Sequence, residues 1–218
     1  MAGALLDSKL LQFAVTCDNR ADPRDEKMNR GKAIMFVDNS NVFHGSRQSG
    51  WRLDAKKMHA YLEKPGPIWQ TFFFAAVSDP PRYSQTNFYK MLKTELHYEM
   101  TVLPLGHKTV SCGKCRDKRR VYTEKGIDVA LSTKLLLLAY NRAFETGILI
   151  SGDKDYLETV QAVKNMGLRV EIVSWRQSLS KELGNESSSA VIYLDDLKGE
   201  IAMKGPFELE VEKLLEPE

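Results

Sequence analysis

Short runs of consecutive apolar residues recur along the chain and predict the buried strands of a sheet. The first is 33–37, and a continuous run of this length is typical of a strand covered on both faces. Ile68–Val77 is rich in aromatic and β-branched residues, which favour strands. The remaining predicted strands are 100–103, 148–150, 170–173 and 190–194.

Between these runs, apolar residues recur at the three- and four-residue spacing of one helix face. The strongest such pattern is Ile127–Tyr140, and the other predicted helices are 53–63, 85–98, 155–166 and 175–183. Strands that alternate with helices predict a mostly parallel α/β sheet with helices on both faces. Ligands of such sheets bind beyond the carboxyl ends of the strands.

The alternation also predicts how the chain is organised. We expect residues 1–31 to be a poorly ordered N-terminal extension, because they include a charged linker. We expect one domain at 32–197, with an irregular basic insertion at about 105–125, and a C-terminal tail or helix at 198–218. Residues 45–50, rich in Gly and Ser, predict a flexible loop after the first strand.

Composition places the chain among soluble intracellular proteins. It has 218 residues, of which 43% are hydrophobic, enough for one domain with a real core. Its net charge of +2 excludes a uniformly cationic protein. Three cysteines cannot form a closed disulfide framework, which indicates a reducing compartment.

No apolar run approaches the ~20 residues that cross a bilayer, and the apolar stretch 10–15 lacks the basic flank of a signal peptide. We therefore expect a cytoplasmic protein without membrane contact.

Acidic residues lie where two predicted strands end. Asp38 follows the first strand, Asp153 follows the fourth, and Asp128 begins the helix between them. Taken singly, acids such as Asp128 and Asp155 are ordinary helix-capping residues. Taken together at one sheet edge, such carboxylates repel each other unless a cation such as Mg²⁺ or Mn²⁺ offsets their charge. Such an ion can activate water for attack on a phosphodiester.

Three motifs in order resemble the NYN domain, a branch of the PIN-like nucleases related to LabA-type proteins. They are 37–41 (Val-Asp-Asn-Ser-Asn), 124–129 (Glu-Lys-Gly-Ile-Asp-Val) and 150–155 (Ile-Ser-Gly-Asp-Lys-Asp). The likeness spans about residues 33–195. It implies a three-layer Rossmann-like (PIN-like) fold with an acidic Mg²⁺ or Mn²⁺ site that hydrolyses RNA.

The resemblance also implies roles for individual residues. Asp38, Asp128 and Asp153 would be metal ligands, with Asp155 as a further ligand or supporting acid. Asn41 would position substrate or metal-bound water. Many relatives carry another acid within the helix that begins at Asp128, where this chain has Lys134. That departure suggests weaker metal binding, or a lysine that contacts phosphate instead.

Positive charge is concentrated between His107 and Lys125. Seven basic and two acidic residues give this stretch a charge of +5, which leaves the rest of the chain with 24 basic and 27 acidic residues, or −3. A basic segment beside an acidic metal site suits a polyanion, and RNA is the expected partner; Tyr122 could stack on a base. The candidate nucleic-acid-binding residues are Lys114, Arg116, Lys118, Arg119, Arg120 and Lys125.

Cys112 and Cys115 have the C-x-x-C spacing of half a zinc site. A full site needs four ligands, and only His107 is close in sequence. A Zn²⁺ site shared across a homodimer is one alternative, and a pair of free thiols in a turn is the other.

Two other functions compete with metal-dependent RNA cleavage. One is an RNA-binding or regulatory module of PIN-like fold that has lost efficient cleavage, for which Lys134 is the reason. The other is a phosphatase of the haloacid dehalogenase type. It is disfavoured because its first strand needs a second acid two residues after the nucleophile, where this chain has Ser40.

Overall fold

A six-stranded sheet forms the centre of the computed structural model, which describes residues 30–204 except 79, 81–82, 112–114 and 116–117. Its order is β3-β2-β1-β6-β7-β8, and every neighbouring pair is parallel. The predicted α/β class is therefore confirmed. The strands are β1 (Ala33–Asp38), β2 (Ile68–Val77), β3 (Glu99–Pro104), β6 (Thr146–Ile150), β7 (Arg169–Ser174) and β8 (Ile192–Tyr193).

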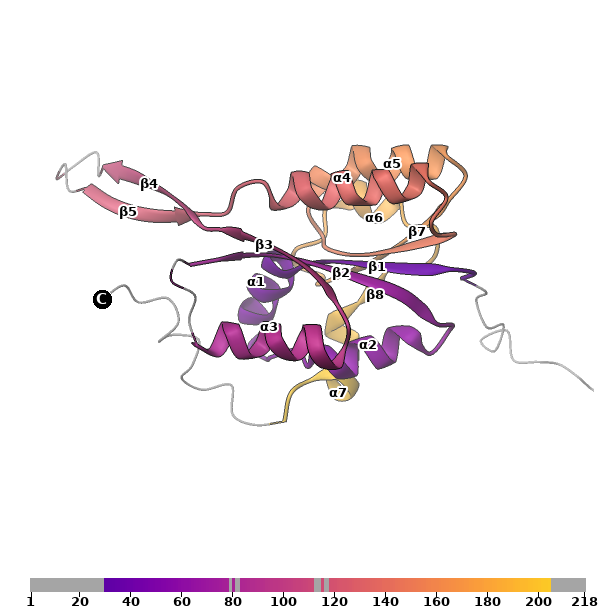
Figure 1. Cartoon of the computed structure of the whole chain (residues 1–218), viewed down its shortest axis with the longest axis horizontal. Helices are drawn as coiled ribbons and strands as arrows, with labels where there is room; N and C mark the ends of the chain where they lie inside the picture. The colour runs from indigo at the N-terminus through magenta and orange to yellow at the C-terminus, as the bar shows by residue number, and fades with distance from the viewer. Residues whose placement is uncertain (1–29, 79, 81–82, 112–114, 116–117, 205–218) are drawn as a thin grey trace, which may run out of the picture.

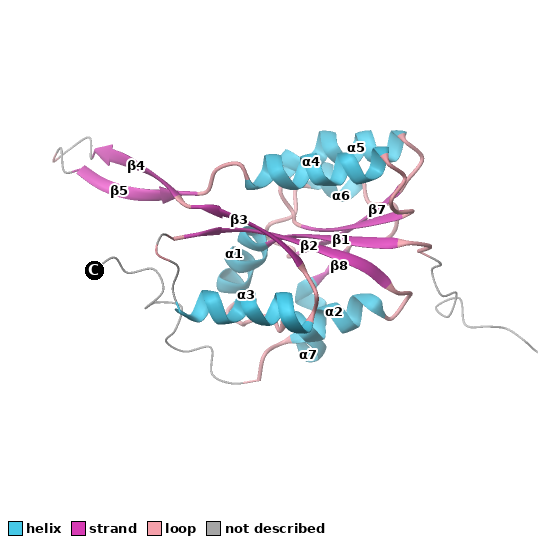
Figure 2. Ribbon diagram, viewed as in Figure 1, coloured by secondary structure: helices cyan, strands magenta, loops and turns pink. Residues whose placement is uncertain are grey.

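Helices cover both faces of the sheet and complete three layers (Figure 1). One face carries α4 (Ile127–Tyr140), α5 (Leu157–Asn165) and α6 (Lys181–Asn185). The other carries α1 (Asn39–Ser49), α2 (Ala55–Glu63), α3 (Tyr83–Glu95) and α7 (Lys198–Ile201), as Figure 2 also shows. Short 3₁₀ turns, Lys154–Tyr156 and Leu194–Leu197, precede α5 and α7.

The central strands are apolar throughout because both of their faces are covered. Every residue of β1 and β6 is buried. Met35 and Val37 pack into the layer with α2, whereas Ile34 and Phe36 pack into the layer with α4. This double burial explains why unbroken apolar runs, rather than alternating ones, mark these strands.

Residues 45–50 form the end of a helix, so the predicted flexible loop is wrong. The carboxylate of Asp38 accepts hydrogen bonds from the first backbone N–H groups of α1, and Gly50 ends the helix with φ 71°. Gly45 is needed for close packing, because a Cβ there would lie 2.0 Å from the ring of Trp175. Gly45 and Gly50 therefore serve the packing and the end of the helix and do not mark a loop.

The basic insertion is not irregular but contains an antiparallel hairpin, β4 (Gly106–Ser111) and β5 (Lys118–Thr123). It extends beyond the rest of the domain (Figure 1). Residues 107–111 are all exposed, so this hairpin lacks the apolar pattern by which a strand is recognised. The predicted helix at 175–183 is also shorter and later, since helical structure begins at Lys181 after the Ser180 cap.

The predicted N-terminal extension lies outside the described residues except for its last two, and most of the predicted C-terminal tail, 205–218, also lies outside. Arg30 is 2% exposed and pairs with Glu171. Among the described helices, none combines the length and the apolar character needed to cross a bilayer.

Candidate active site

The carboxylate of Asp38 ends β1 and is fixed by five hydrogen-bond donors. Its Oδ1 accepts from the backbone N–H of Ser40 (3.1 Å), the Ser40 hydroxyl (3.0 Å) and the N–H of Asn41 (3.3 Å). Its Oδ2 accepts from the hydroxyls of Ser151 (3.1 Å) and Tyr156 (3.2 Å). Asp38 is 4% exposed. So many donors suit an ionised carboxylate held in one orientation.

Asp153 lies at the same edge of the sheet as Asp38. Their strands, β1 and β6, are parallel neighbours, with Val37 opposite Ile150. The hydroxyl of Ser151, which donates to Asp38, also accepts from the backbone N–H of Asp153 at 3.2 Å. The two acids predicted from the strand ends are therefore linked through one serine.

Asn41 ties the start of α1 to the segments that follow β6 and β7. Its Oδ1 accepts from the backbone N–H of Gly152 and from the Ser178 hydroxyl, both at 3.2 Å. Gly152 has no room for a side chain, because a Cβ there would lie 2.5 Å from the Ser178 carbonyl oxygen. The amide oxygen of Asn41 is thus engaged within the protein and helps to fix the loop that carries Asp153.

All three acids that are expected to bind metal affect the pKa of the buried Tyr156 hydroxyl. Burial raises the pKa of Tyr156 above its ordinary value, and the charges of Asp38, Asp128 and Asp153 together with the hydrogen bond to Asp38 raise it further. The phenol therefore stays protonated and acts as a donor to Asp38. Asp38, Asp128 and Asp153 consequently share one electrostatic environment.

Asp128 and Asp155 line an open hollow of about 540 Å³ beside this group. Asp128 lies in the first turn of α4, which begins after Gly126 with φ 79°. The backbone N–H of Asp155 donates to Asp153 Oδ1 at 3.1 Å. Glu158, Glu182 and Lys154 complete the polar lining, so the hollow is mainly acidic.

Glu124 is an acid of this site that the sequence analysis treated only as a counter-charge in the basic stretch. Although the residue as a whole is exposed, partial desolvation raises the pKa of its carboxyl, and the charge of Asp38 raises it further. A hydrogen bond from Ser40 and the charge of His44 act in the opposite direction. Glu124 therefore lies near Asp38 and near Ser40 and His44 of α1.

The donor chemistry at this edge fits a divalent cation, although the side chains do not form a ready coordination sphere. Asp38, Asp128, Asp153 and Glu124 offer hard oxygen ligands whose charges oppose one another, as the raised pKa of Glu124 indicates. Within the part of the chain that the structure describes, however, no three His, Cys, Asp or Glu side chains are grouped closely enough to hold one ion. Asp128, Asp153 and Glu124 are exposed, so their side chains can turn without disturbing the core.

Lys134 is engaged away from these acids. Its Nζ lies 3.0 Å from Glu99 Oε1 on the edge strand β3 and 4.6 Å from the centre of the Phe72 ring. The idea that Lys134 contacts phosphate therefore has no support in its geometry. The lysine instead joins α4 to the sheet.

The basic residues predicted to bind nucleic acid are only partly described. Lys118 and Lys125 are exposed, and Tyr122 is 60% exposed. Arg119 and Arg120 belong to β5, opposite Val110 and Thr109. Lys114 and Arg116 lie outside the described residues.

The predicted zinc half-site is also only partly described. Cys115 is a free, exposed thiol. Its expected partner Cys112 lies outside the described residues.

The residues that the sequence analysis missed are those that act through tertiary contacts. In the sequence, Tyr156 looks like one more position of the predicted helix 155–166, and Glu124 like a counter-charge in the basic stretch. Only the packing of α1, the hairpin and the turn after β6 brings them to Asp38. The position of Glu124 in the second of the three motifs was the one available signal.

Comparison with known proteins agrees with the fold. The family model described as the NYN domain matches residues 32–195. A crystal structure of a protein of unknown function from Vibrio parahaemolyticus is similar, with a TM-score of 0.62 and 17% sequence identity. The similarity covers 81% of this chain and 98% of that one, and it speaks for the fold alone. None of the curated proteins compared with the chain matches it.

Proposed function

Because the chain belongs to the NYN domain family, within the PIN-like nuclease superfamily, we propose that it is a divalent-metal-dependent endoribonuclease. The observation that carries the proposal lies at the carboxyl edge of the sheet, where the Tyr156 hydroxyl donates to Asp38 and where its pKa, raised first by burial, is raised further by Asp38, Asp128 and Asp153. Among the described residues, the ion pairs found involve none of these three carboxylates. Their charge is thus left to be offset by something from solution.

Asp38, Asp128 and Asp153 would hold Mg²⁺ or Mn²⁺, with Asp155 in support. When bound, such an ion would activate a water molecule for attack and offset negative charge on the phosphodiester. Tyr156 and Ser151 keep Asp38 oriented through their hydrogen bonds. Asn41 holds the loop that carries Asp153.

Glu124 is the group best suited to hold or move a proton at this site. Its pKa is raised by partial desolvation and by Asp38, which brings its titration closer to neutral pH. It directly follows β5, the second strand of the basic hairpin, and lies three residues before α4 begins. Lys118 and Lys125, with the other basic residues of the insertion, would hold the RNA backbone near it.

A second function, RNA binding without efficient cleavage, is favoured by two observations. The described acids do not form a three-ligand group, and Lys134, which stands in place of a further acid, is paired with Glu99. Membership of the LabA-like branch, a cytoplasmic location, zinc at Cys112 and Cys115, and a homodimer stay predictions from the sequence.

The test is cleavage of labelled single-stranded RNA during a Mn²⁺ titration. We expect cleavage that needs the metal and falls at least a hundredfold in Asp153→Asn. Asp196→Asn is the matched control, because it makes the same change at an exposed acid outside this group. Binding of RNA without Asp153-dependent cleavage would favour the binding module.

A further inference from the structure

One face of α1 leads away from the acidic site. Ser40, His44 and Arg47 are spaced four and three residues apart, which places them on the same side of the helix. The opposite side faces the segment after β7, where the Gln177 amide donates to the Gly45 carbonyl (3.1 Å) and to the Ser49 hydroxyl (3.0 Å). The face with His44 and Arg47 is thus turned towards solvent.

This face of α1, which we call the stripe of Ser40, His44 and Arg47, begins next to the acids of the site. The Ser40 hydroxyl donates to Asp38 Oδ1 at 3.0 Å, and Ser40 also lies close enough to Glu124 to lower its pKa. The charge of His44 lowers the pKa of Glu124, whereas that of Asp38 raises it. Asp38, Ser40 and His44 therefore all lie near enough to Glu124 to affect its ionisation.

The stripe ends in a hollow. An open depression of about 290 Å³ is lined by His44, Arg47 and Gln48, all three of which are exposed. In the described part of the chain, Arg47 is absent from the ion pairs found. A cation and an amide donor left open to solvent at the border of an acidic site suit an anionic ligand.

We infer that His44, Arg47 and Gln48 form a subsite for the backbone phosphate of single-stranded RNA, next to the acidic site. The inference rests on the proposed function, since it assigns the path of that same substrate. The guanidinium fork of Arg47 matches the geometry of a phosphate, and the Gln48 amide offers a further donor.

The length of the stripe sets which phosphate it holds. Ser40 and Arg47 are separated by about 10 Å along the helix axis, at ~1.5 Å per residue. The phosphates of one strand of B-DNA recur every ~3.4 Å along the helix axis, so a span of this length exceeds the spacing between neighbouring phosphates. RNA with its scissile phosphate at Asp38 and Glu124 would therefore place a different phosphate of the same strand at Arg47.

Fluorescence anisotropy of a labelled single-stranded RNA of about 12 nucleotides, measured in EDTA so that the probe is not cut, tests the subsite. Arg47→Glu is compared with Lys198→Glu, which makes the same charge change at an exposed residue of α7. We expect Arg47→Glu to weaken binding about tenfold, and Lys198→Glu less than twofold. The milder Arg47→Gln should lower the salt slope of log K by about one.

Equal weakening by Arg47→Glu and Lys198→Glu, or no RNA binding by the wild type, overturns the subsite. Circular dichroism of each variant excludes loss of folding as the cause. If Arg47→Glu alone weakens binding but the wild type shows no metal-dependent cleavage, the subsite stands and the nuclease proposal fails. If cleavage is metal-dependent but Arg47→Glu leaves RNA affinity unchanged, the nuclease proposal stands and the subsite fails.

Discussion

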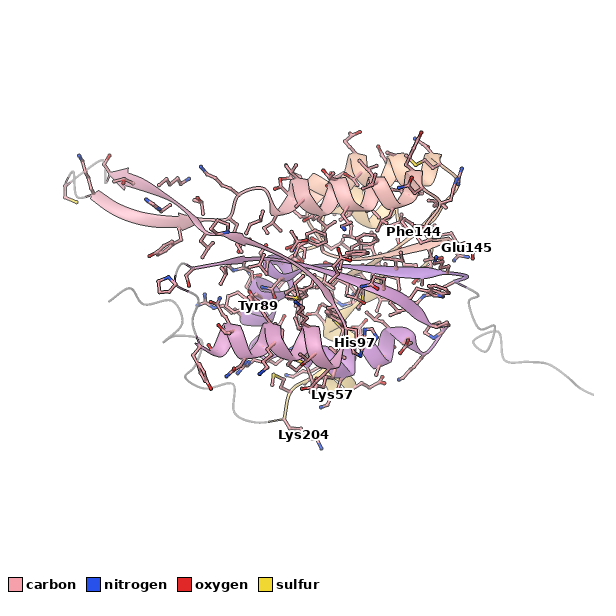
Figure 3. All side chains as sticks on the ribbon, viewed as in Figure 1. Lys57, Tyr89, His97, Phe144, Glu145 and Lys204 are labelled. Carbon is pink, nitrogen blue, oxygen red and sulfur yellow. The ribbon has the colours of Figure 1, made fainter. Side chains whose placement is uncertain are left out.

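At the scale of single residues, Glu124 shows how tertiary neighbours rather than sequence neighbours set ionisation. Lys125 follows it directly in the chain, and the surrounding stretch is strongly basic. Its pKa is nevertheless raised, first by desolvation and then by Asp38. Nearby Tyr89, which lies between α3 and the sheet (Figure 3), has its pKa raised to about 12 by burial and by Glu124.

The raised pKa of Glu124 predicts how stability depends on pH. A carboxyl that ionises less readily in the folded protein favours folding when it is protonated, so this contribution is lost as pH rises above the ordinary value of 4.5 and through the raised pKa. Glu124→Gln should therefore be more stable than the wild type at pH 7 but not at about pH 4. Urea unfolding at the two pH values, with Glu95→Gln as control, measures this; a gain of equal size at both would contradict it.

The acids of the candidate site could be predicted from the sequence, because a parallel sheet brings the ends of its strands to one edge. Asp38 and Asp153 follow from that rule, and Asp128 from its place at a helix start. The partners of these acids could not be predicted. The hydroxyl of Tyr156 reaches Asp38 across 118 residues of sequence, and no periodic pattern specifies such a contact.

At the scale of elements, α4 is held to the sheet by a pair that has no catalytic role in this account. Lys134 lies over the Phe72 ring and pairs with Glu99, which is 52% exposed. In place of a further acid near the site, this chain therefore has a lysine that joins α4 to the edge strand β3.

Lys134→Ala should cost about 0.5–1 kcal/mol of unfolding free energy and leave RNA affinity within twofold. The reason is that its ammonium group is engaged with Glu99 in a partly exposed pair. A double-mutant cycle with Glu99→Ala isolates the interaction. A tenfold loss of RNA affinity would instead show that Lys134 reaches the substrate.

Elements with a buried face could be predicted and exposed ones could not. The strands β1 and β6 are apolar throughout and were recognised as such. In the hairpin of β4 and β5, residues 107–111 of β4 are all exposed, so this sequence resembles an irregular charged stretch. The helix α1 was hidden by Gly45 and Gly50, which serve its packing and its end.

At the scale of the whole molecule, a buried ion pair joins the start of the domain to strand β7 of the sheet. Arg30 Nη2 lies 2.7 Å from Glu171 Oε2, and Arg30 also donates to the Leu62 carbonyl at the end of α2. Glu171 is fully buried, and among the described residues its Oε1 finds no hydrogen-bond partner. A buried carboxylate with one free oxygen depends strongly on its remaining partner.

Arg30→Met should therefore lower the free energy of unfolding by about 3–5 kcal/mol, because it leaves the charge of Glu171 buried and unpaired. The control is Lys56→Met, which breaks the exposed pair with Glu95 and should cost no more than about 1 kcal/mol. Urea unfolding of both variants measures the difference. Similar small losses would mean that Arg30 is not part of the cooperative fold.

The central claim is that acids from distant parts of the chain act together on one divalent cation. Calorimetric titration of Mn²⁺ into the wild type, Asp38→Asn and Asp153→Asn tests it without any assay of activity. The account predicts one tight site in the wild type and at least a tenfold weaker dissociation constant in each variant. Absence of Mn²⁺ binding by the wild type, or equal binding by Asp153→Asn, would contradict it.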